Sequence, residues 1–150
     1  MDGNLIVRPA MVDDAYELAR LNAAFNGSRE APEHLGRRLT DPRRVETPLV
    51  AEIDQRVVGF ASLRLVPCVF YAEPRAELTE LFVEVAHRRR GIGHALVAYA
   101  ERLAVEGGAK ELFVLTGFEN QAAQTLYRAR GYRDYDLALC KELGLSAKVK

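Results

Sequence analysis

The sequence predicts a single α/β domain over residues 1–150, a three-layer α/β/α sandwich built around a mixed sheet. Size and composition support one domain, because 150 residues with 49% hydrophobic content can bury one continuous core. Short β-rich runs alternate with amphipathic helical segments along the chain. Two of these runs form a hairpin and later ones are joined through helices, so both antiparallel and parallel neighbours are expected.

The N-terminal part is expected to contain one strand and two helices. Residues 4–8 form a short apolar run that Pro9 ends, because proline cannot donate to a continuing ladder. Asp13 is expected to cap the next helix, whose apolar residues recur every three or four positions as far as Gly27. A second, short helix is predicted over 32–39, since a proline suits its first turn.

The middle of the chain predicts an antiparallel hairpin and a third strand. Residues 49–53 and 56–66 are β-rich and are separated by Asp54-Gln55, which is a hairpin spacing. The segment 67–75 has a proline near each end and is expected to be a loop or a frayed strand end. Strand character returns over 77–85.

The C-terminal part alternates helices and strands. Apolar residues at helical spacing over 92–103 predict a helix that Gly107-Gly108 ends. A strand is expected over 112–116 and a helix over 120–130. Residues 137–143 alternate in polarity, which predicts a last strand.

The charge balance excludes two broad classes of partner. The chain has 21 basic and 21 acidic residues, so it lacks the net field that non-specific nucleic-acid or membrane-surface binding needs. Two cysteines are too few for a disulfide framework, and no apolar run has the length of a membrane span or the layout of a signal peptide. A reduced, cytoplasmic setting is expected. The three histidines show no metal-ligand spacing, which predicts no metal.

One turn concentrates positive charge. Residues 87–96 read HRRRGIGHAL and join the predicted strand over 77–85 to a helix. The first N–H groups of a helix have no internal acceptors, so together with the helix dipole they form a site for phosphate. Gly91 and Gly93 permit left-handed dihedrals that let these groups converge on one anion. We predict a pyrophosphate site, with a solvated arginine cluster as the alternative.

Two common phosphate loops do not fit this turn. Leu96 stands where a dinucleotide fingerprint needs glycine or alanine, and the chain has no Gly-Lys-Ser/Thr run of the nucleoside-triphosphate loop.

Two motifs do fit a known family. The run from Arg88 to Gly93 matches Arg/Gln-x-x-Gly-x-Gly/Ala. A second motif, Asn-x-x-Ala-x-x-x-Tyr followed by glycine and an aromatic residue, is matched by Asn120, Ala123, Tyr127, Gly131 and Tyr132. With both motifs in order, the sequence resembles the GNAT superfamily of acetyl-CoA-dependent N-acetyltransferases. Val85 stands where the family often has proline, and Tyr132 where it often has phenylalanine.

The resemblance implies a fold and a coenzyme site. The GNAT-like sheet would be mostly antiparallel, and the strand before the phosphate loop would splay from its neighbour. Backbone groups of Phe82 and Val83 would then hold the pantetheine arm and the thioester oxygen of acetyl-CoA. Asn120 would contact the pantetheine or nearby ordered structure. Backbone donors would take the pyrophosphate, and they belong to Arg88, Arg89, Arg90, Gly91, Ile92, Gly93, His94 and Ala95.

Two side chains are candidate catalytic residues. Tyr127 matches the family tyrosine near the coenzyme sulfur, where a phenol acts as general acid; packing in the core is the alternative. Glu80 alternates with Leu78 and Phe82 on a strand expected to be central, where desolvation would raise the pKa of its carboxyl and make it a base. A structural ion pair is the alternative for Glu80.

These features predict an N-acetyltransferase that moves acetyl from acetyl-CoA to a primary amine of a small molecule, peptide or protein, by direct attack in a ternary complex. The alternative is an acetyl-CoA-binding sensor or assembly module. The sequence lacks the interleaved exposed aromatic residues and the basic face that an RNA-binding domain would need. The acceptor, the preferred acyl group and the oligomeric state stay open, and exchange of the last strand is one route to a homodimer.

Overall fold

The computed structural model describes residues 3–144 and contains a five-stranded sheet in the order β1-β2-β3-β4-β5. The first four strands form an antiparallel meander, and β5 lies parallel to β4. The predicted mixed, mostly antiparallel sheet is therefore confirmed. The strands are β1 (Leu5–Pro9), β2 (Glu46–Ile53), β3 (Arg56–Val66), β4 (Arg75–Val83) and β5 (Leu112–Val114).

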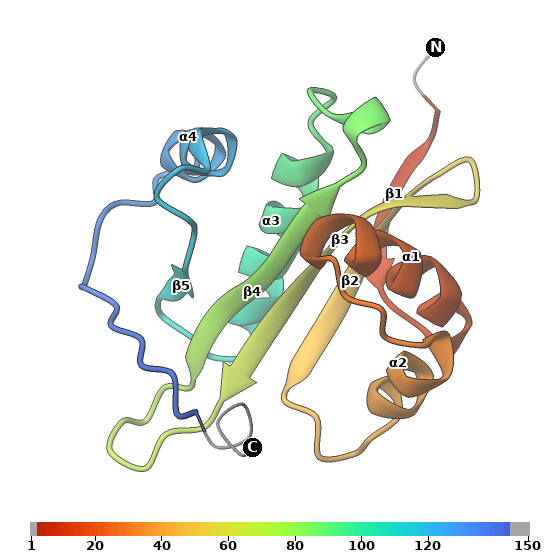
Figure 1. Ribbon diagram of the computed structural model, residues 1–150. Helices are drawn as coiled ribbons and strands as arrows, with labels where there is room; N and C mark the ends of the chain where they lie inside the picture. Colours follow the sequence, from red (N-terminus) through yellow and green to blue (C-terminus); the bar gives the residue numbers. More distant parts are fainter. Residues whose placement is uncertain (1–2, 145–150) are drawn as a thin grey trace.

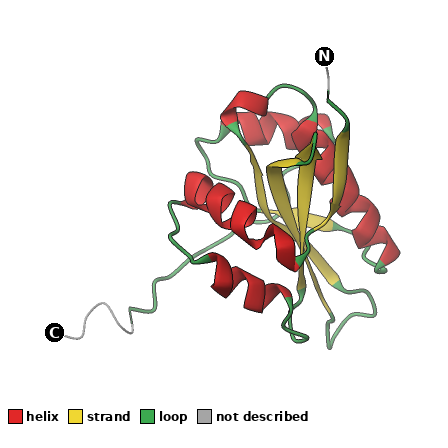
Figure 2. Cartoon of the chain, turned by 90° about the vertical axis from the view of Figure 1, so that its right-hand side faces the viewer, coloured by secondary structure: helices red, strands yellow, loops and turns green. Residues whose placement is uncertain are grey.

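Helices cover both faces of the sheet (Figures 1 and 2). Helices α1 and α2 pack on one face, and α3 and α4 lie on the other, which confirms the predicted three layers. Within residues 3–144, no helix has the length and apolar content needed to cross a bilayer. The helices are α1 (Ala15–Asn26), α2 (Pro32–Leu39), α3 (Ile92–Glu106) and α4 (Gln121–Ala129), with short 3-10 turns at Val12–Asp14 and Val85–His87.

The core has two halves because side chains of a strand alternate between its faces. On β3, Val58 faces the α3 side and the adjacent Val57 faces the α1 side, and both are almost fully buried. The α1 half is held by aromatic rings: Phe25 of α1 stacks on Phe82 of β4 at 5.1 Å, and Phe60 of β3 lies 6.2 Å from each. These contacts set α1 against β4.

The start of α1 differs from the prediction in one residue. Asp14, not the exposed Asp13, is the anchoring carboxylate, and it accepts the Met11 N–H at 2.7 Å. Arg8 of β1 donates to Asp14 at 2.8 Å and to Glu52 of β2 at 2.9 Å. The guanidinium lowers the pKa of Asp14. The prediction chose the wrong one of two adjacent aspartates because the partner, Arg8, comes from another element.

Three strand predictions were too long or wrong. The strands expected over 77–85 and 112–116 end at Val83 and Val114. The strand expected over 137–143 does not form; these residues have no regular structure, and Leu139 is 86% exposed. Alternating polarity gives a segment a face to bury, but a strand also needs its backbone paired, and residues 137–143 pair with no strand of the described sheet.

The β2–β3 turn has the backbone of a type I′ hairpin. Both of its central residues are left-handed, with φ of 49° at Asp54 and 68° at Gln55. This turn matches the twist of the two strands, which explains why the predicted hairpin forms without a glycine. The side chains nevertheless carry the steric cost of left-handed dihedrals.

Replacing Gln55 with glycine should stabilise the protein. A non-glycine residue in the left-handed conformation destabilises the fold by about 1–2 kcal/mol. Glycine has more conformational freedom in the unfolded chain, which offsets about 0.4–1 kcal/mol of this, so the net gain in the free energy of unfolding should be about 0.5–1 kcal/mol. The urea midpoint measures it. As a control, Gly27→Ala places a side chain at φ +67° and should lower the midpoint. A lower midpoint for Gln55→Gly would contradict this account of the turn.

Candidate active site

Strand β4 has one edge that is only partly paired. Its other edge pairs with β3 from Arg75 to Val83, except at Thr79, where the register shifts. Pairing with β5 covers only three positions and ends at Leu78 opposite Val114. The chain then leaves the sheet, so residues 79–83 have an edge without a strand partner in the described structure (Figure 1). The splayed strand implied by the family resemblance is present.

The open edge presents backbone groups of Leu81 and Val83. Glu84 N–H donates to Val58 O of β3 at 2.9 Å. Bonding alternates along an antiparallel pair, so Phe82 also bonds toward β3, and the residues on either side of it face away. A ligand lying along β4 would therefore meet Leu81 and Val83.

The two residues predicted to contact the pantetheine, Phe82 and Val83, thus have backbones that face opposite edges of β4. The backbone of Phe82 is directed to β3, and its side chain is 8% exposed in the aromatic cluster. Phe82 therefore packs in the core and offers no backbone group to a ligand on the open edge. Val83 faces the edge, where its carbonyl accepts a hydrogen bond from Arg88 Nε at 2.8 Å. Sequence reasoning missed Leu81, because the direction of a backbone group depends on register with β3.

A cleft of about 120 Å³ lies along this edge, between β4 and the segment after β5. It brings together Glu80, Asn120 and Tyr127, which the sequence singled out from a strand and a distant helix. Thr79 and Leu81 line it as well. The three candidate side chains are therefore neighbours only in the folded chain.

Tyr127 fits both interpretations that the sequence left open. It is 6% exposed and belongs to the core cluster, where its ring lies 5.4 Å from the ring of Tyr132. It also lines the cleft. Burial raises the pKa of Tyr127 to about 12, so the phenol keeps its proton at neutral pH and can donate a hydrogen bond.

Asn120 positions α4 rather than presenting all of its amide to the cleft. Its Oδ1 accepts the Ala123 N–H at 3.1 Å and so caps the helix. The Asn-x-x-Ala spacing of the motif is the spacing of this cap. Asn120 thereby fixes the first turn of the helix that carries Tyr127.

The arginine-glycine turn has the predicted left-handed backbone at one of its two glycines. Gly91 is the N-cap of α3 with φ of +79°, and Arg89 is also left-handed at +60°. Space is open beside Gly91, since no atom lies within 4 Å of the position a Cβ would take. An anion can therefore approach the backbone there.

The predicted N–H donors divide into engaged and available groups. Arg88 N–H donates to Val85 O at 3.3 Å, and Ala95 N–H donates to Gly91 O at 3.0 Å. Between them, residues 92–94 form the first turn of α3, whose N–H groups have no helical acceptors. Arg90 Nη1 lies 3.0 Å from His87 Nδ1 on the same turn.

Gly93 has a different role from the one predicted. It lies within α3, not in a left-handed conformation, and a Cβ there would come within 2.8 Å of Leu126 Cδ1 on α4. Its missing side chain leaves room for the end of the Leu126 side chain against the start of α3. Leu126 precedes Tyr127, which lines the cleft.

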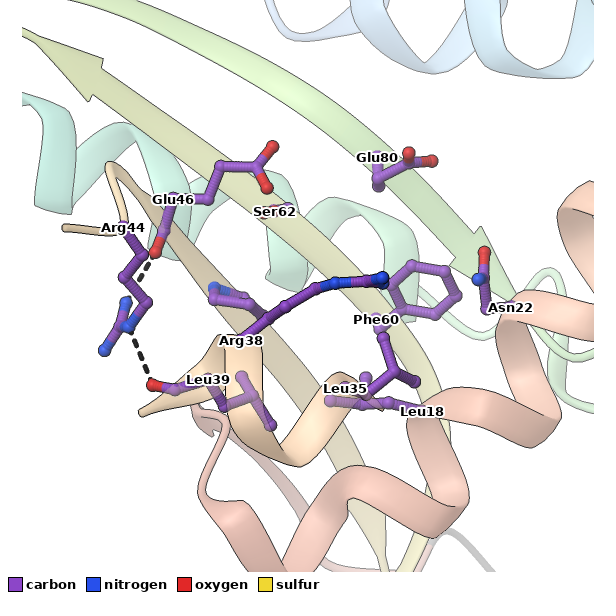
Figure 3. Close-up of a pocket in the computed structure, with 11 residues that line it drawn as sticks. Leu18, Asn22, Leu35, Arg38, Leu39, Arg44, Glu46, Phe60, Ser62 and Glu80 are labelled. Carbon is purple, nitrogen blue, oxygen red and sulfur yellow. Dashed lines mark hydrogen bonds between the residues drawn. The ribbon is translucent and has the colours of Figure 1, made fainter. Parts of the chain in front are cut away.

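A second pocket of about 280 Å³ opens on the other side of β4, between the sheet and helices α1 and α2 (Figure 3). Leu18, Leu35 and Phe60 give it apolar walls. Glu46, Ser62 and Glu80 give it a floor of oxygen atoms from three adjacent strands. Glu80 lines this pocket and also the cleft, so it stands where the two meet.

The environment of Glu80 favours its neutral form. Burial raises the pKa of Glu80; a hydrogen bond from Asn26 at 3.5 Å opposes this rise, and the Glu46 carboxylate adds to it. The described structure gives Glu80 no salt bridge, so the ion-pair alternative is not supported. A carboxylate with a raised pKa is a better proton acceptor near neutral pH.

Sequence reasoning did not find Glu46, Thr79 or Ser62 as parts of this region. A bulge shifts the β3–β4 register between Ser62 and Leu63, and Thr79 Oγ1 then lies 3.0 Å from Glu46 Oε1. No local pattern marks the bulge. Among residues 3–144, no group of three or more His, Cys, Asp or Glu side chains could hold a metal ion.

Comparison of the sequence with known proteins identifies its family. A model of the acetyltransferase (GNAT) family matches residues 12–132. N-acetyltransferase 8 of Homo sapiens is 36% identical over 84 residues, 56% of this chain, and the match spans only 37% of that protein's length. The uncharacterized N-acetyltransferase YhfO of Bacillus subtilis is 29% identical over 133 residues, 85% of this chain and 89% of that protein.

Solved structures agree on the fold. The aminoglycoside N-acetyltransferase AAC(6′)-Iy, crystallised in complex with CoA, superposes with a TM-score of 0.81 at 20% identity, covering 95% of this chain and 96% of that one. The family model extends from the start of α1 through the cleft to Tyr132 and so includes both motifs. The chain belongs to the acetyltransferase (GNAT) family.

Proposed function

We propose that this protein is an N-acetyltransferase that transfers acetyl from acetyl-CoA to a primary amine within a ternary complex. The observation that carries the proposal is the position of Glu80, which joins the cleft on the open edge of β4 to the pocket under α1 and α2. A donor along the edge and an acceptor in the pocket would meet at this carboxylate.

The residues present fit the coenzyme. The N–H groups of residues 92–94 face an approach that Gly91 keeps open, which suits a diphosphate. The backbone of Leu81 and Val83 suits the amide-bearing pantetheine arm. When bound, acetyl-CoA supplies an activated acetyl group as a thioester.

The chain's own groups supply what acetyl transfer requires. Glu80 takes a proton from the incoming ammonium, directly or through water, and leaves an amine lone pair free to attack. A backbone N–H on the open edge, that of Val83, stabilises the negative charge that develops on the thioester oxygen. Tyr127 donates a hydrogen bond to the departing sulfur.

The pKa of Tyr127 limits its role to donation. A phenol with a pKa near 12 is a weaker acid than an ordinary thiol, whose pKa is about 8.5, so complete proton transfer to the thiolate is uphill. A strong hydrogen bond is the favourable arrangement. The proton that finally reaches the thiol comes from the amine.

The arginine-glycine turn should affect catalysis only through its contacts with the diphosphate of acetyl-CoA. We expect the double variant Arg89→Gln, Arg90→Gln to lower kcat/KM for acetyl-CoA by about a hundredfold or more, since each of the two charge-assisted contacts is worth about 1.5–3 kcal/mol. With S-acetylpantetheine, which lacks the diphosphate, kcat/KM should not change. Arg43→Gln, on an exposed loop after α2, is the matched control. Equal losses with both donors would contradict the assignment.

Tyr127→Phe should lower kcat by about tenfold to a hundredfold, because a hydrogen bond to a charged group contributes about 1.5–3 kcal/mol. The KM for acetyl-CoA and the melting temperature should stay close to those of the wild type. Thiol release from acetyl-CoA in the presence of an amine panel measures this. Unchanged turnover would leave Tyr127 with a packing role alone, and coenzyme binding without thiol release from the wild type would favour a sensor.

Glu80→Gln should lower kcat/KM and remove the acidic limb of its pH profile. In the wild type this limb should lie above the ordinary glutamate range, because burial raises the pKa of Glu80 and the protonated carboxyl cannot accept a proton. The same raised pKa makes the wild type lose stability as pH rises through it, so Glu80→Gln should melt no lower at neutral pH. An unchanged pH profile would exclude Glu80 as the base.

A further inference from the structure

The floor of the pocket under α1 and α2 is a row of three oxygen-bearing side chains. Glu46, Ser62 and Glu80 lie on the adjacent strands β2, β3 and β4. Ser62 is opposite Glu80 in the register of β3 and β4. Figure 3 shows the Glu46 carboxylate turned toward Ser62, with Glu80 beyond it on the next strand.

Ser62 is unusual in this row because its hydroxyl is unsatisfied. The residue is only 4% exposed, and its Oγ has no hydrogen-bond partner within residues 3–144. Buried hydroxyl groups almost always have partners, and leaving one without a partner destabilises the fold. Ser62 also lines the pocket, so a ligand bound there would give this hydroxyl the partner that it lacks.

The neighbouring carboxylate of Glu46 is held in place. Thr79 Oγ1 lies 3.0 Å from Glu46 Oε1 and 3.3 Å from the carbonyl oxygen of Ser62. Thr79 occupies this position because of the β-bulge at Ser62. Through the bulge, Thr79 of β4 contacts both Glu46 of β2 and Ser62 of β3.

The row suits an ammonium group. Two carboxylates and a hydroxyl offer acceptors, and a primary ammonium has three N–H donors and no acceptor. Once Glu80 has taken one proton, a primary amine keeps two N–H groups for Ser62 and Glu46. Its lone pair takes the place of the N–H that pointed at Glu80, the member of the row that also lines the cleft. A secondary amine keeps a single N–H and leaves one acceptor unpaired.

The rest of the pocket favours an apolar body with a single positive charge. Leu18, Leu35 and Phe60 form the walls. Arg38 extends from α2 to beside Phe60 (Figure 3), where it would repel a second cation. Its ion pair with Glu30, at 3.4 Å, is exposed and weakly neutralising.

We propose that Glu46, Ser62 and Glu80 form the acceptor-ammonium site, that it selects compact primary monoamines with an apolar body, and that Ser62 is the positioning residue that orients the amine. The inference rests on the proposed acetyl transfer and adds the class of acceptor. Ser62 stands outside both sequence motifs.

The test compares phenethylamine with N-methylphenethylamine as acceptors. The wild type should prefer the primary amine by at least about tenfold in kcat/KM. Ser62→Ala should lower kcat/KM for phenethylamine by about tenfold and bring the ratio of the two amines closer to one, with the KM for acetyl-CoA unchanged. Ser28→Ala, the same change on the α1–α2 loop outside the pocket, should leave both amines unaffected.

Stability separates this role from a structural one. Since the Ser62 hydroxyl has no partner, Ser62→Ala should melt at the same temperature as the wild type or higher. A lower melting temperature with an unchanged amine ratio would overturn the proposal. A preference for 1,6-diaminohexane over hexylamine would also overturn it, because it would show that a second cation is welcome.

A binding measurement separates failure of this proposal from failure of the proposed function. Calorimetry of phenethylamine with the protein and coenzyme A should show weaker binding, by about tenfold, for Ser62→Ala. If no amine releases thiol from acetyl-CoA but this Ser62-dependent binding persists, acetyl transfer fails and the ammonium site stands. If amines are acetylated and neither binding nor selectivity depends on Ser62, the ammonium site fails and acetyl transfer stands.

Discussion

The divergence of β5 from β4 is the constraint on which the rest of the site depends. Hydrogen-bonding groups of a buried backbone need partners, and a strand inside a sheet normally finds them on both sides. Strand β4 loses its second neighbour after Leu78, near the middle of its length. The chain itself covers only part of the exposed edge, through the contact of Arg88 with Val83 O. The remaining backbone groups form a ready surface for an extended, amide-bearing ligand.

The elements around this edge serve to present it. Helix α3 follows β4 through the arginine-glycine turn, and its first turn has N–H groups without helical acceptors. Helix α4 forms the opposite side of the cleft, and the absence of a side chain at Gly93 leaves room for the Leu126 side chain of α4. On the other face, the stacked rings of Phe25 and Phe82 hold α1 against β4. Strand β4 thus separates two cavities, and Glu80 reaches both.

Several features of this region lower the stability of the fold. Ser62 buries a hydroxyl without a partner, the carboxyl of Glu80 is desolvated, and Arg89 adopts a left-handed backbone. Each departs from what stability alone would favour, and all three lie on the cleft, the pocket under α1 and α2, or the arginine-glycine turn. Such departures concentrate at functional sites, because groups satisfied within the protein cannot also bind a ligand.

Local patterns in the sequence predicted most elements. A motif led to Tyr127 through a family resemblance, and alternation along a strand expected to be central led to Glu80. The helix over Pro32–Leu39 and the hairpin at Asp54 formed as expected, because periodicity and turn length act over a few residues. The strand expected over 137–143 did not form. Strand pairing, register and the bulge that places Ser62 depend on contacts between segments far apart in the sequence. These contacts form only when the whole sheet assembles, so short-range patterns do not predict them.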